Sequence, residues 1–249
     1  MFCQMAYALS ILLRCCCYSH YPSGAILSEG LWGDFQSRRQ KVIYTTRDNF
    51  FPISMRRGMH PDGQDIFGEV DWMEGHEPSR KALELVMLSF YRACRLNIFI
   101  TLHIDDDCMG GGTSIPHEET ISFDTDYDDY KDTYFATERE DIFHYCLFAH
   151  FVTSDGDNVG GIHAGGHFTV ADAEWTSIEA GSCFMHELGH AIGLHSWNFD
   201  GIDSYKYTFE QYPSCMNYNA PDDFYGYSSG PDSSTNYNDW EHLNLGEYL

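Results

Sequence analysis

The stretch HELGHAIGLHS, residues 186–196, decides how this chain is interpreted. His186 and His190 are four residues apart, so on a helix both imidazoles face the same side, one turn apart. This spacing lets two histidines bind one zinc ion. Glu187 is better placed to take a proton from a metal-bound water than to act as a ligand. The apolar flanks CFM and AIGL indicate a partly buried helix, where two histidines without a partner are costly, so the sequence predicts a metal site.

The same stretch, together with YPSCMNY at 212–218, resembles the metzincin zinc endopeptidases. Their long motif is HExxHxxGxxH, and a Met-containing turn follows later under the metal. Gly193 matches the family glycine at which the chain leaves the helix, and Met216 matches the Met-turn methionine. Tyr218 matches the tyrosine that astacin-like and serralysin-like members place beside the zinc, where it ligates the metal or stabilises the oxyanion.

The resemblance covers roughly residues 65–245. The stretch GGHFTVADAEWTS before the helix is similar to the corresponding stretch of matrix metalloproteinases. In overall sequence texture the chain looks like uncharacterised, acidic zinc metalloproteases of haloarchaeal type. The resemblance implies a metzincin-like α/β (α+β) domain with a twisted mixed sheet, an active-site helix and a Met-turn.

For function, the resemblance implies zinc-dependent hydrolysis of peptide bonds. His186 and His190 would hold Zn²⁺, and Glu187 would accept the proton of the attacking water and deliver it to the leaving amine. Tyr218 would help to stabilise the oxyanion. The edge strand before the helix would align an extended peptide or protein substrate by main-chain pairing, and we expect the enzyme to be a monomer.

The third zinc ligand departs from the family pattern. The family histidine lies six residues after the second ligand, where this chain has Ser196. Three replacements are open, namely the histidine one position earlier, an aspartate just downstream, and a glutamate at the spacing of the thermolysin-like gluzincins: His195, Asp200 or Asp203, and Glu210. We expect His195, because Gly193 gives the backbone freedom to bring it to the metal. The shortened turn also leaves open a different function, a catalytically weakened metzincin-like binding module.

The sequence also leaves open a second cation site, although it favours residues without a metal. In matrix metalloproteinases the loop before the active-site helix carries ligands of a structural zinc, and the similar segment here contains several candidate side chains: His150, His163, His167, Asp155 and Asp157. The aspartates of this loop would also suit Ca²⁺. The alternative is that these are ordinary loop or strand residues without a metal, as we expect for His103 and His144. The acidic segment 124–132 fails the EF-hand pattern, with Asp129 in place of the glycine and Phe135 in place of the glutamate.

The net charge of −24 arises from 38 acidic against 14 basic residues. Such a surface repels nucleic acid and anionic membranes, which excludes both as natural partners. Two explanations compete, calcium sites and adaptation to high salt, where screening weakens the repulsion between like charges. The carboxylates are spread along the whole chain, which favours a halophilic protein.

The length and apolar content predict one globular domain, residues 41–249, preceded by a leader or poorly ordered segment, residues 1–40. The short apolar stretch near the start is too short to span a bilayer and marginal as a secretion signal. It leaves the location open and favours an extracellular one. Nine cysteines without a CxxC pair argue against a full disulfide framework. Cys183 and Cys215, which the resemblance places near the zinc floor, are expected as buried free thiols rather than a disulfide.

Apolar spacing predicts the order strand, helix, strand at the start of the domain: 65–73, 77–93 and 97–105. The polar, acidic residues 105–134 predict a long surface connection. A helix running into a strand is expected at 138–151, and the Gly- and Asp-rich residues 154–168 predict a loop.

The active-site helix should begin at Thr176 or Ser177, either of which can cap it, and end at Gly193. The residues from 197 onward are rich in Tyr, Asp, Pro and Gly and predict loop, with a short helix around NDWEHLN near the C-terminus.

Overall fold

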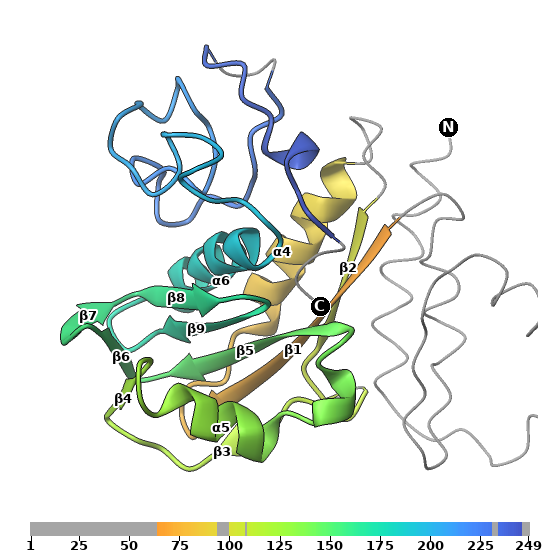
Figure 1. Ribbon diagram of the computed structural model, residues 1–249, viewed down its shortest axis with the longest axis vertical. Coiled ribbons are helices and arrows are strands. Elements are labelled where there is room, and N and C mark those ends of the chain that lie inside the picture. Colours follow the sequence, from red (N-terminus) through yellow and green to blue (C-terminus); the bar gives the residue numbers. More distant parts are fainter. Residues whose placement is uncertain (1–63, 94–99, 108, 231–233, 246–249) are drawn as a thin grey trace, which may run out of the picture. The chain divides into compact units, whose positions relative to one another are not determined.

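Strand β1 (Gln64–Met73) lies inside a mixed sheet in which most strands are parallel (Figure 1). In this computed structural model the described residues are 64–93, 100–107, 109–230 and 234–245. The strand order is β2-β1-β5-β9-β8, and only the edge strand β8 runs antiparallel to its neighbour. The two-residue strand β3 extends the sheet beside the end of β1. The remaining bounds are β2 Ile100–Asp105, β3 Ser114–Ile115, β5 Phe143–Ala149, β8 Gly161–Ala164 and β9 His167–Ala171.

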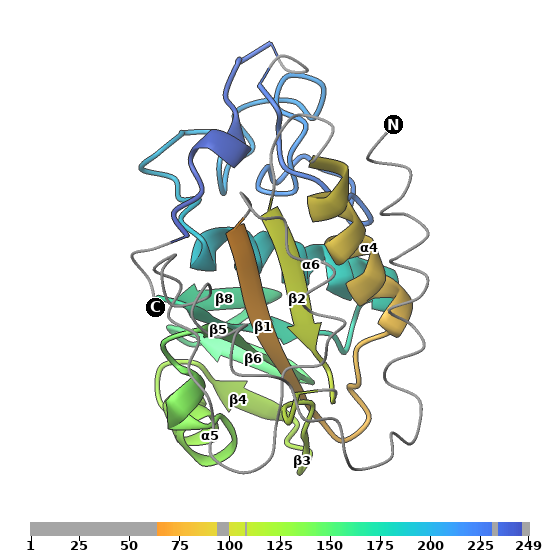
Figure 2. The same cartoon turned by 90° about the vertical axis from the view of Figure 1, so that its right-hand side faces the viewer.

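Helices cover both faces of this sheet, α4 (Arg80–Ala93) and α6 (Ser177–Ala191) on one face and α5 (Tyr127–Tyr134) on the other (Figures 1 and 2). Strand β5 is buried along its whole length, as expected for a strand covered on both sides. Its side chains alternate between two cores: Cys146 and Phe148 belong to the core under α4 and α6, and Tyr145 and Leu147 to the core under α5.

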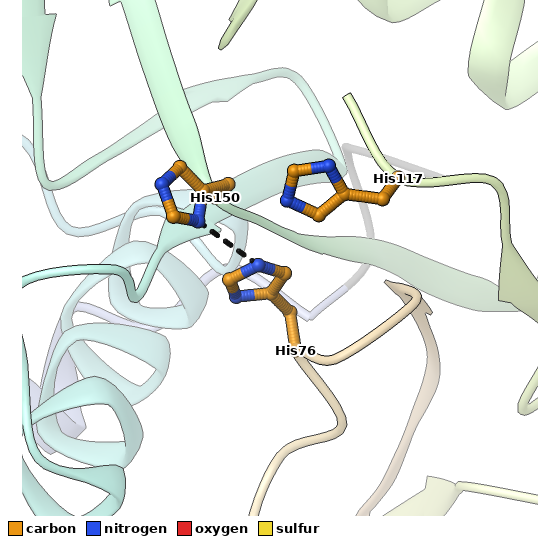
Figure 3. Close-up of side chains that lie close together, drawn as sticks. All are labelled: His76, His117 and His150. Carbon is orange, nitrogen blue, oxygen red and sulfur yellow. Dashed lines mark hydrogen bonds between the residues drawn. The ribbon is translucent and has the colours of Figure 1, made fainter. Parts of the chain in front are cut away.

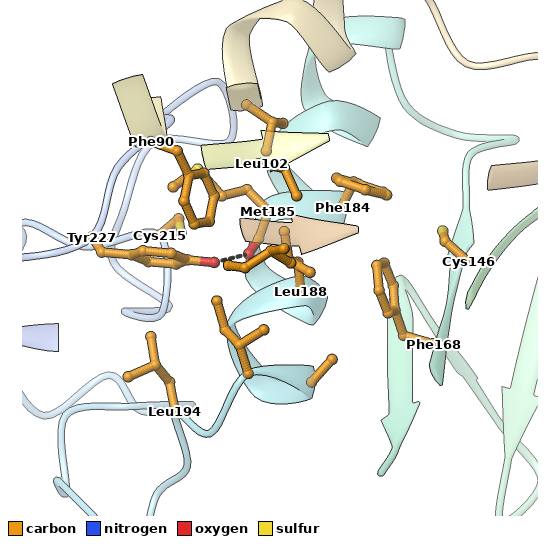
Figure 4. Close-up of a cluster of buried hydrophobic side chains, with 14 of the residues drawn as sticks. Phe90, Leu102, Cys146, Phe168, Phe184, Met185, Leu188, Leu194, Cys215 and Tyr227 are labelled. Atoms are coloured by element: carbon orange, nitrogen blue, oxygen red, sulfur yellow. Dashed lines mark hydrogen bonds between the residues drawn. The ribbon is translucent and has the colours of Figure 1, made fainter. Parts of the chain in front are cut away.

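The core under α6 fixes the height of that helix above the sheet. Phe184 and Leu188 are almost fully buried and point into it, where the ring of Phe184 lies edge-on to that of Phe168 of β9 (Figure 4). On the other side of the helix, the Tyr227 hydroxyl donates a hydrogen bond of 2.7 Å to the carbonyl of Met185. The helix is thus held between the sheet and the C-terminal segment.

A small second sheet lies beside the first and contains β4 (Thr120–Ser122), β6 (Phe151–Ser154) and β7 (Asp157–Val159). Strands β4 and β6 are parallel, and β6 and β7 form an antiparallel hairpin.

The expected order of strand, helix and strand is confirmed by β1, α4 and β2, although residues 94–99 lie outside the described part. The expectation of an irregular connection at 105–134 is wrong, because this segment contains β3, β4 and α5. Helix α5 is acidic and weakly amphipathic, but its Tyr127 is only 2% exposed and packs close to Tyr145. Tertiary packing of its aromatic face therefore stabilises a helix that the local sequence does not predict.

The expected loop at 154–168 is also wrong, because it contains β7 and β8. Strand β8 is held by its antiparallel main-chain pairing with β9, and its one large apolar side chain, Ile162, packs against the core under α5. The helix expected at the start of 138–151 is a single 3₁₀ turn, Thr137–Arg139, followed by β5.

Helix α6 begins and ends as expected. Thr176 is the N-cap, and with Glu179 it forms a reciprocal capping box. The helix ends at Ala191, and Gly193 has a φ of +103°, a conformation that favours glycine. Beyond residue 197 the described chain forms irregular loops, apart from a 3₁₀ turn at Asp239–Glu241 that confirms the short helix near the C-terminus.

The predicted leader, residues 1–40, and the predicted domain start at residue 41 lie outside the described residues. In the described part, no helix has the length and apolar character needed to cross a bilayer.

Candidate metal centre

Helix α6 brings the imidazoles of His186 and His190 together, with their Nε2 atoms 3.1 Å apart. The other ring nitrogen of each faces a backbone carbonyl: Nδ1 of His186 lies 2.8 Å from the oxygen of Cys215, and Nδ1 of His190 lies 2.6 Å from that of Leu194. A carbonyl oxygen only accepts, so each Nδ1 carries the hydrogen. In the neutral form of each ring, Nε2 then has a free lone pair. Both lone pairs are directed toward the same position, as those of metal-binding imidazoles are.

Asp203 completes this group from the loop that follows α6. Its Oδ1 lies 3.2 Å from Nε2 of His186 and 3.1 Å from Nε2 of His190. Tetrahedral zinc with bonds of about 2.0–2.2 Å separates its ligand atoms by about 3.3–3.5 Å, so the triangle needs only a small expansion to hold the ion. The donor set of two imidazoles and one carboxylate therefore fits Zn²⁺ and leaves one tetrahedral position for a fourth ligand.

The pKa shifts of His186 and Asp203 also indicate that positive charge is stabilised at this position. Burial alone would lower the pKa of His186, but the Asp203 hydrogen bond and the charge of Glu187 outweigh burial and raise it to about 9. Burial would raise the pKa of Asp203, yet its hydrogen bonds to both imidazoles hold it well below the usual range. Without a metal, a proton stabilises these converging acceptors, and a divalent cation would take its place.

Glu187 is buried beside the triangle and against the edge strand β8. Its Oε2 lies 3.8 Å from Nδ1 of His163, and burial raises its pKa despite the nearby imidazoles. Strand β8 approaches so closely that a Cβ on Gly161 would lie 2.6 Å from Cγ and 2.7 Å from Oε1 of Glu187. Glycine at this position is what lets the strand pack against the carboxylate.

Met216 and Tyr218, in the expected Met-turn segment, also contact the group. Met216 is fully buried, and its carbonyl accepts a 3.0 Å hydrogen bond from the backbone N–H of Asp203. Tyr218 is 48% exposed, and its ring centroid lies 6.0 Å from that of His186. Burial and the charges of Asp203 and Glu187 raise the pKa of Tyr218 to about 12, so at neutral pH its hydroxyl is a hydrogen-bond donor.

His195, the expected third ligand, lies near the centre but outside the 3.1–3.2 Å triangle. Its ring stacks on Trp197 at 3.9 Å and lies 5.7 Å from the ring of His190. It belongs to a second, looser group with His163 and His190, in which the ligand atoms lie within 4.8 Å of one another. The third-ligand assignment to His195 remains a prediction, and the shorter distances favour Asp203.

The other two alternatives belong to no metal-binding group in the described part of the chain. Asp200 forms an ion pair with Lys206 and accepts a 3.0 Å hydrogen bond from the Tyr207 hydroxyl. Glu210 is exposed on the loop at 207–211, which gives the gluzincin-type arrangement no support.

The side chains expected at a second structural zinc do not gather into one group. His163 joins the looser histidine group at α6, and His150 joins a separate cluster with His76 and His117. His167 is partly buried beside Phe135. Sequence reasoning named His163 but expected it at a different metal, and it missed His76 and His117, whose local sequence does not distinguish them from ordinary loop histidines.

His103 and His144 are packed residues, as expected, bound to Asp65 at 2.9 Å and to the carbonyl of Gly166 at 3.0 Å. Cys183 and Cys215 are free thiols, which confirms the expectation for this pair.

A scan of the chain against protein-family models gives no match, and neither does a search of curated protein sequences. The geometry of this centre is therefore the basis on which a function is assigned.

Proposed function

We propose that this protein is a zinc-dependent endopeptidase of metzincin type. The observation that carries the proposal is the convergence of Nε2 of His186, Nε2 of His190 and Oδ1 of Asp203 within 3.1–3.2 Å of one another, with a buried carboxylate beside them. In this proposal Asp203 takes the place expected for His195. When bound, zinc supplies Lewis acidity toward the scissile carbonyl and lowers the pKa of water.

Glu187 is the general base of the proposed reaction. Its raised pKa suits it both to accept the proton of the attacking water and to return that proton to the leaving amine. Its position against β8 fixes the carboxylate, so little reorganisation is needed during proton transfer.

Tyr218 is the proposed oxyanion donor. Its hydroxyl is protonated at neutral pH and its ring lies beside His186. A hydrogen-bond donor aimed at the developing charge contributes about 3 kcal/mol in comparable sites.

Strand β8 is the proposed substrate template. It is the last strand in the order of the main sheet, so one of its edges faces away from β9. An extended peptide can add to such an edge by main-chain hydrogen bonds, which places it next to Glu187.

The first experiment compares zinc content and cleavage of unfolded casein in four proteins: wild type, Asp203→Ala, His195→Ala and Glu187→Gln. We expect Asp203→Ala to lose most of its zinc and its activity, because two imidazoles remain as ligands. Glu187→Gln should keep its zinc and lose cleavage, because it removes the base and not a ligand.

Loss of zinc in His195→Ala with retention in Asp203→Ala would return the third-ligand role to His195. A wild type that holds zinc without cleaving any peptide would favour the binding module. A wild type without zinc, purified in the absence of chelators, would refute the enzyme.

A further inference from the structure

A second histidine cluster lies beyond the carboxyl ends of two neighbouring strands of the main sheet. His76 follows β1, His117 lies between β3 and β4, and His150 stands between β5 and β6 (Figure 3). Strands β1 and β5 are parallel neighbours, so their carboxyl ends lie side by side at the same end of the sheet. The ring centroids of the three residues are 4.9–5.4 Å apart. Three segments that are distant in sequence therefore present imidazoles to one point.

The ring nitrogens of the cluster are close enough to bind one ion. One nitrogen from each residue lies within 4.8 Å of the others, and Nδ1 of His150 is 3.1 Å from Nε2 of His76. His76 and His150 are partly buried, whereas His117 is exposed. A metal held here would be fixed from the protein side and open to solvent on the other.

Carboxylates occupy the far nitrogens of two of the rings. Nδ1 of His76 donates to Oδ1 of Asp172, which leaves Nε2 with a lone pair directed to the cluster. Nε2 of His150 lies 3.5 Å from Oε1 of Glu119, which favours the hydrogen on that nitrogen and a lone pair on Nδ1. A carboxylate behind a histidine is the arrangement that orients metal-binding imidazoles and raises their basicity.

We propose that His76, His117 and His150 form a second metal site, specific for a divalent transition-metal ion such as Zn²⁺. Imidazole nitrogen suits zinc, copper and nickel, whereas calcium takes oxygen ligands, so this site does not bind Ca²⁺. It shares no residue with the centre on α6. Its ion would tie the turn after β1, the segment before β4 and the start of β6 to one another, so its role is structural.

The cluster without a metal has a simpler explanation, which the experiment has to exclude. If Nδ1 of His150 carries the hydrogen, the 3.1 Å contact is an ordinary N–H···N hydrogen bond in a chain from Asp172 through His76. The side chains of that chain would stay in place without any ion, and zinc would bind no more tightly than to isolated surface histidines.

The test measures zinc per chain by elemental analysis after dialysis against a low zinc concentration, together with the melting temperature. The variants are His117→Ala, His150→Ala, the double variant His186→Ala/His190→Ala, and the control His242→Ala. His117 and His242 are both exposed, so neither substitution should disturb the core, and His242 belongs to no candidate metal group of the described residues.

We expect about two zinc ions in wild type and in the control, and about one in each of the other variants. The zinc-dependent rise in melting temperature should shrink in His117→Ala. Asp172→Asn should weaken the site about 10–100-fold, because it removes the carboxylate behind His76.

Equal zinc content and equal melting shifts in His117→Ala, His150→Ala and the control would overturn the site. The two proposals fail independently. Zinc that is lost with His117 but not with His186 and His190 would refute the catalytic centre and keep this site, and the reverse pattern would do the opposite.

Discussion

The backbone N–H of Asp203 donates to the carbonyl of Met216 at 3.0 Å, so the segment around Met216 holds the loop that carries the third member of the candidate metal centre. Asp203 has a φ of +53°, a left-handed conformation that is uncommon for a residue other than glycine. Tertiary contacts therefore stabilise this local geometry, and the centre depends on packing beneath it as well as on its ligands.

Substitution of Met216 should affect both stability and metal binding. The side chain is fully buried, so Met216→Ala should lower the free energy of unfolding by about 2–5 kcal/mol. Met216→Leu keeps the volume and should cost less than about 1.5 kcal/mol. Urea unfolding of the metal-free proteins measures the cost, and competition with a chelator measures zinc affinity. An unchanged zinc affinity in Met216→Ala would show that the packing of the Met216 side chain does not position Asp203.

Gly161→Ala should impair turnover more than metal binding. The added Cβ would meet Cγ and Oε1 of Glu187 and so displace the proposed base. We expect kcat to fall about 10²-fold with zinc content unchanged, since general base catalysis contributes about 10²–10⁴-fold. The control is Gly68→Ala in β1, where a Cβ meets its nearest atoms at 3.9–4.0 Å. Equal kcat in the two variants would contradict the assigned role of β8.

Arg139 is a buried cation whose loss should be costly. Its guanidinium lies 2.8 Å from Oε2 of Glu69 and 2.6 Å from Oδ2 of Asp105, and all three side chains are almost fully buried. Arg139→Met leaves the buried Asp105 carboxylate without its cation and should cost about 3–5 kcal/mol of unfolding free energy. The matched control is Arg80→Met, because Arg80 is 63% exposed and only 4.0 Å from Asp106.

Adding Glu69→Gln to Arg139→Met should change the free energy of unfolding little at neutral pH, because the Glu69 carboxyl is already protonated there. Burial already raises the pKa of Glu69 to about 8 with Arg139 present. A double variant less stable than Arg139→Met alone would contradict this account of the network.

Asp239 should make stability fall as pH rises. The carboxylate accepts from Tyr212 and Ser214 at 2.6 Å each and from the Ser228 N–H at 2.7 Å, yet burial outweighs these donors and raises its pKa to about 6. Between the ordinary value of 3.8 and about 6, the folded protein keeps a proton that the unfolded chain has released.

The contribution of Asp239 is therefore fully present below 3.8 and is lost as pH rises through about 6, by at most about 3 kcal/mol. Urea unfolding of metal-free Asp239→Asn across this range should show a flatter pH dependence than wild type. Parallel curves for the two proteins would disprove the assignment.

Molar potassium chloride should raise the melting temperature, because it screens the repulsion within a chain of net charge −24. Thermal unfolding at low and high salt tests this prediction. Full folding and activity in dilute buffer, with no gain on adding salt, would contradict adaptation to high salt.

Sequence reasoning succeeded where the chemistry is local. Helix α6 is predicted by its capping residues, by Gly193 and by the spacing of two histidines. Asp203 could be only one of several alternatives, because its position depends on a loop anchored to Met216, thirteen residues further along the chain. Such a contact has no periodic signature.

The hairpin strands β7 and β8 were missed for a related reason. Their sequence is polar and rich in glycine, and their stability comes from main-chain pairing to partners that the local sequence does not reveal. The cluster of His76, His117 and His150 lay equally beyond prediction, because 74 residues separate its first and last members and only the parallel pairing of β1 and β5 joins them.

The contact between Gly161 and Glu187 has a mechanical consequence for the proposed enzyme. In that enzyme, strand β8 would bind the substrate backbone and also contacts Glu187. Binding of a peptide to β8 would therefore affect the position of the Glu187 carboxylate. A peptide long enough to pair along β8 would stiffen that strand and steady the carboxylate at the moment of reaction. Peptides too short to pair with β8 would then have a low kcat even at saturating concentration. The kcat of the enzyme would therefore increase with the length of the peptide.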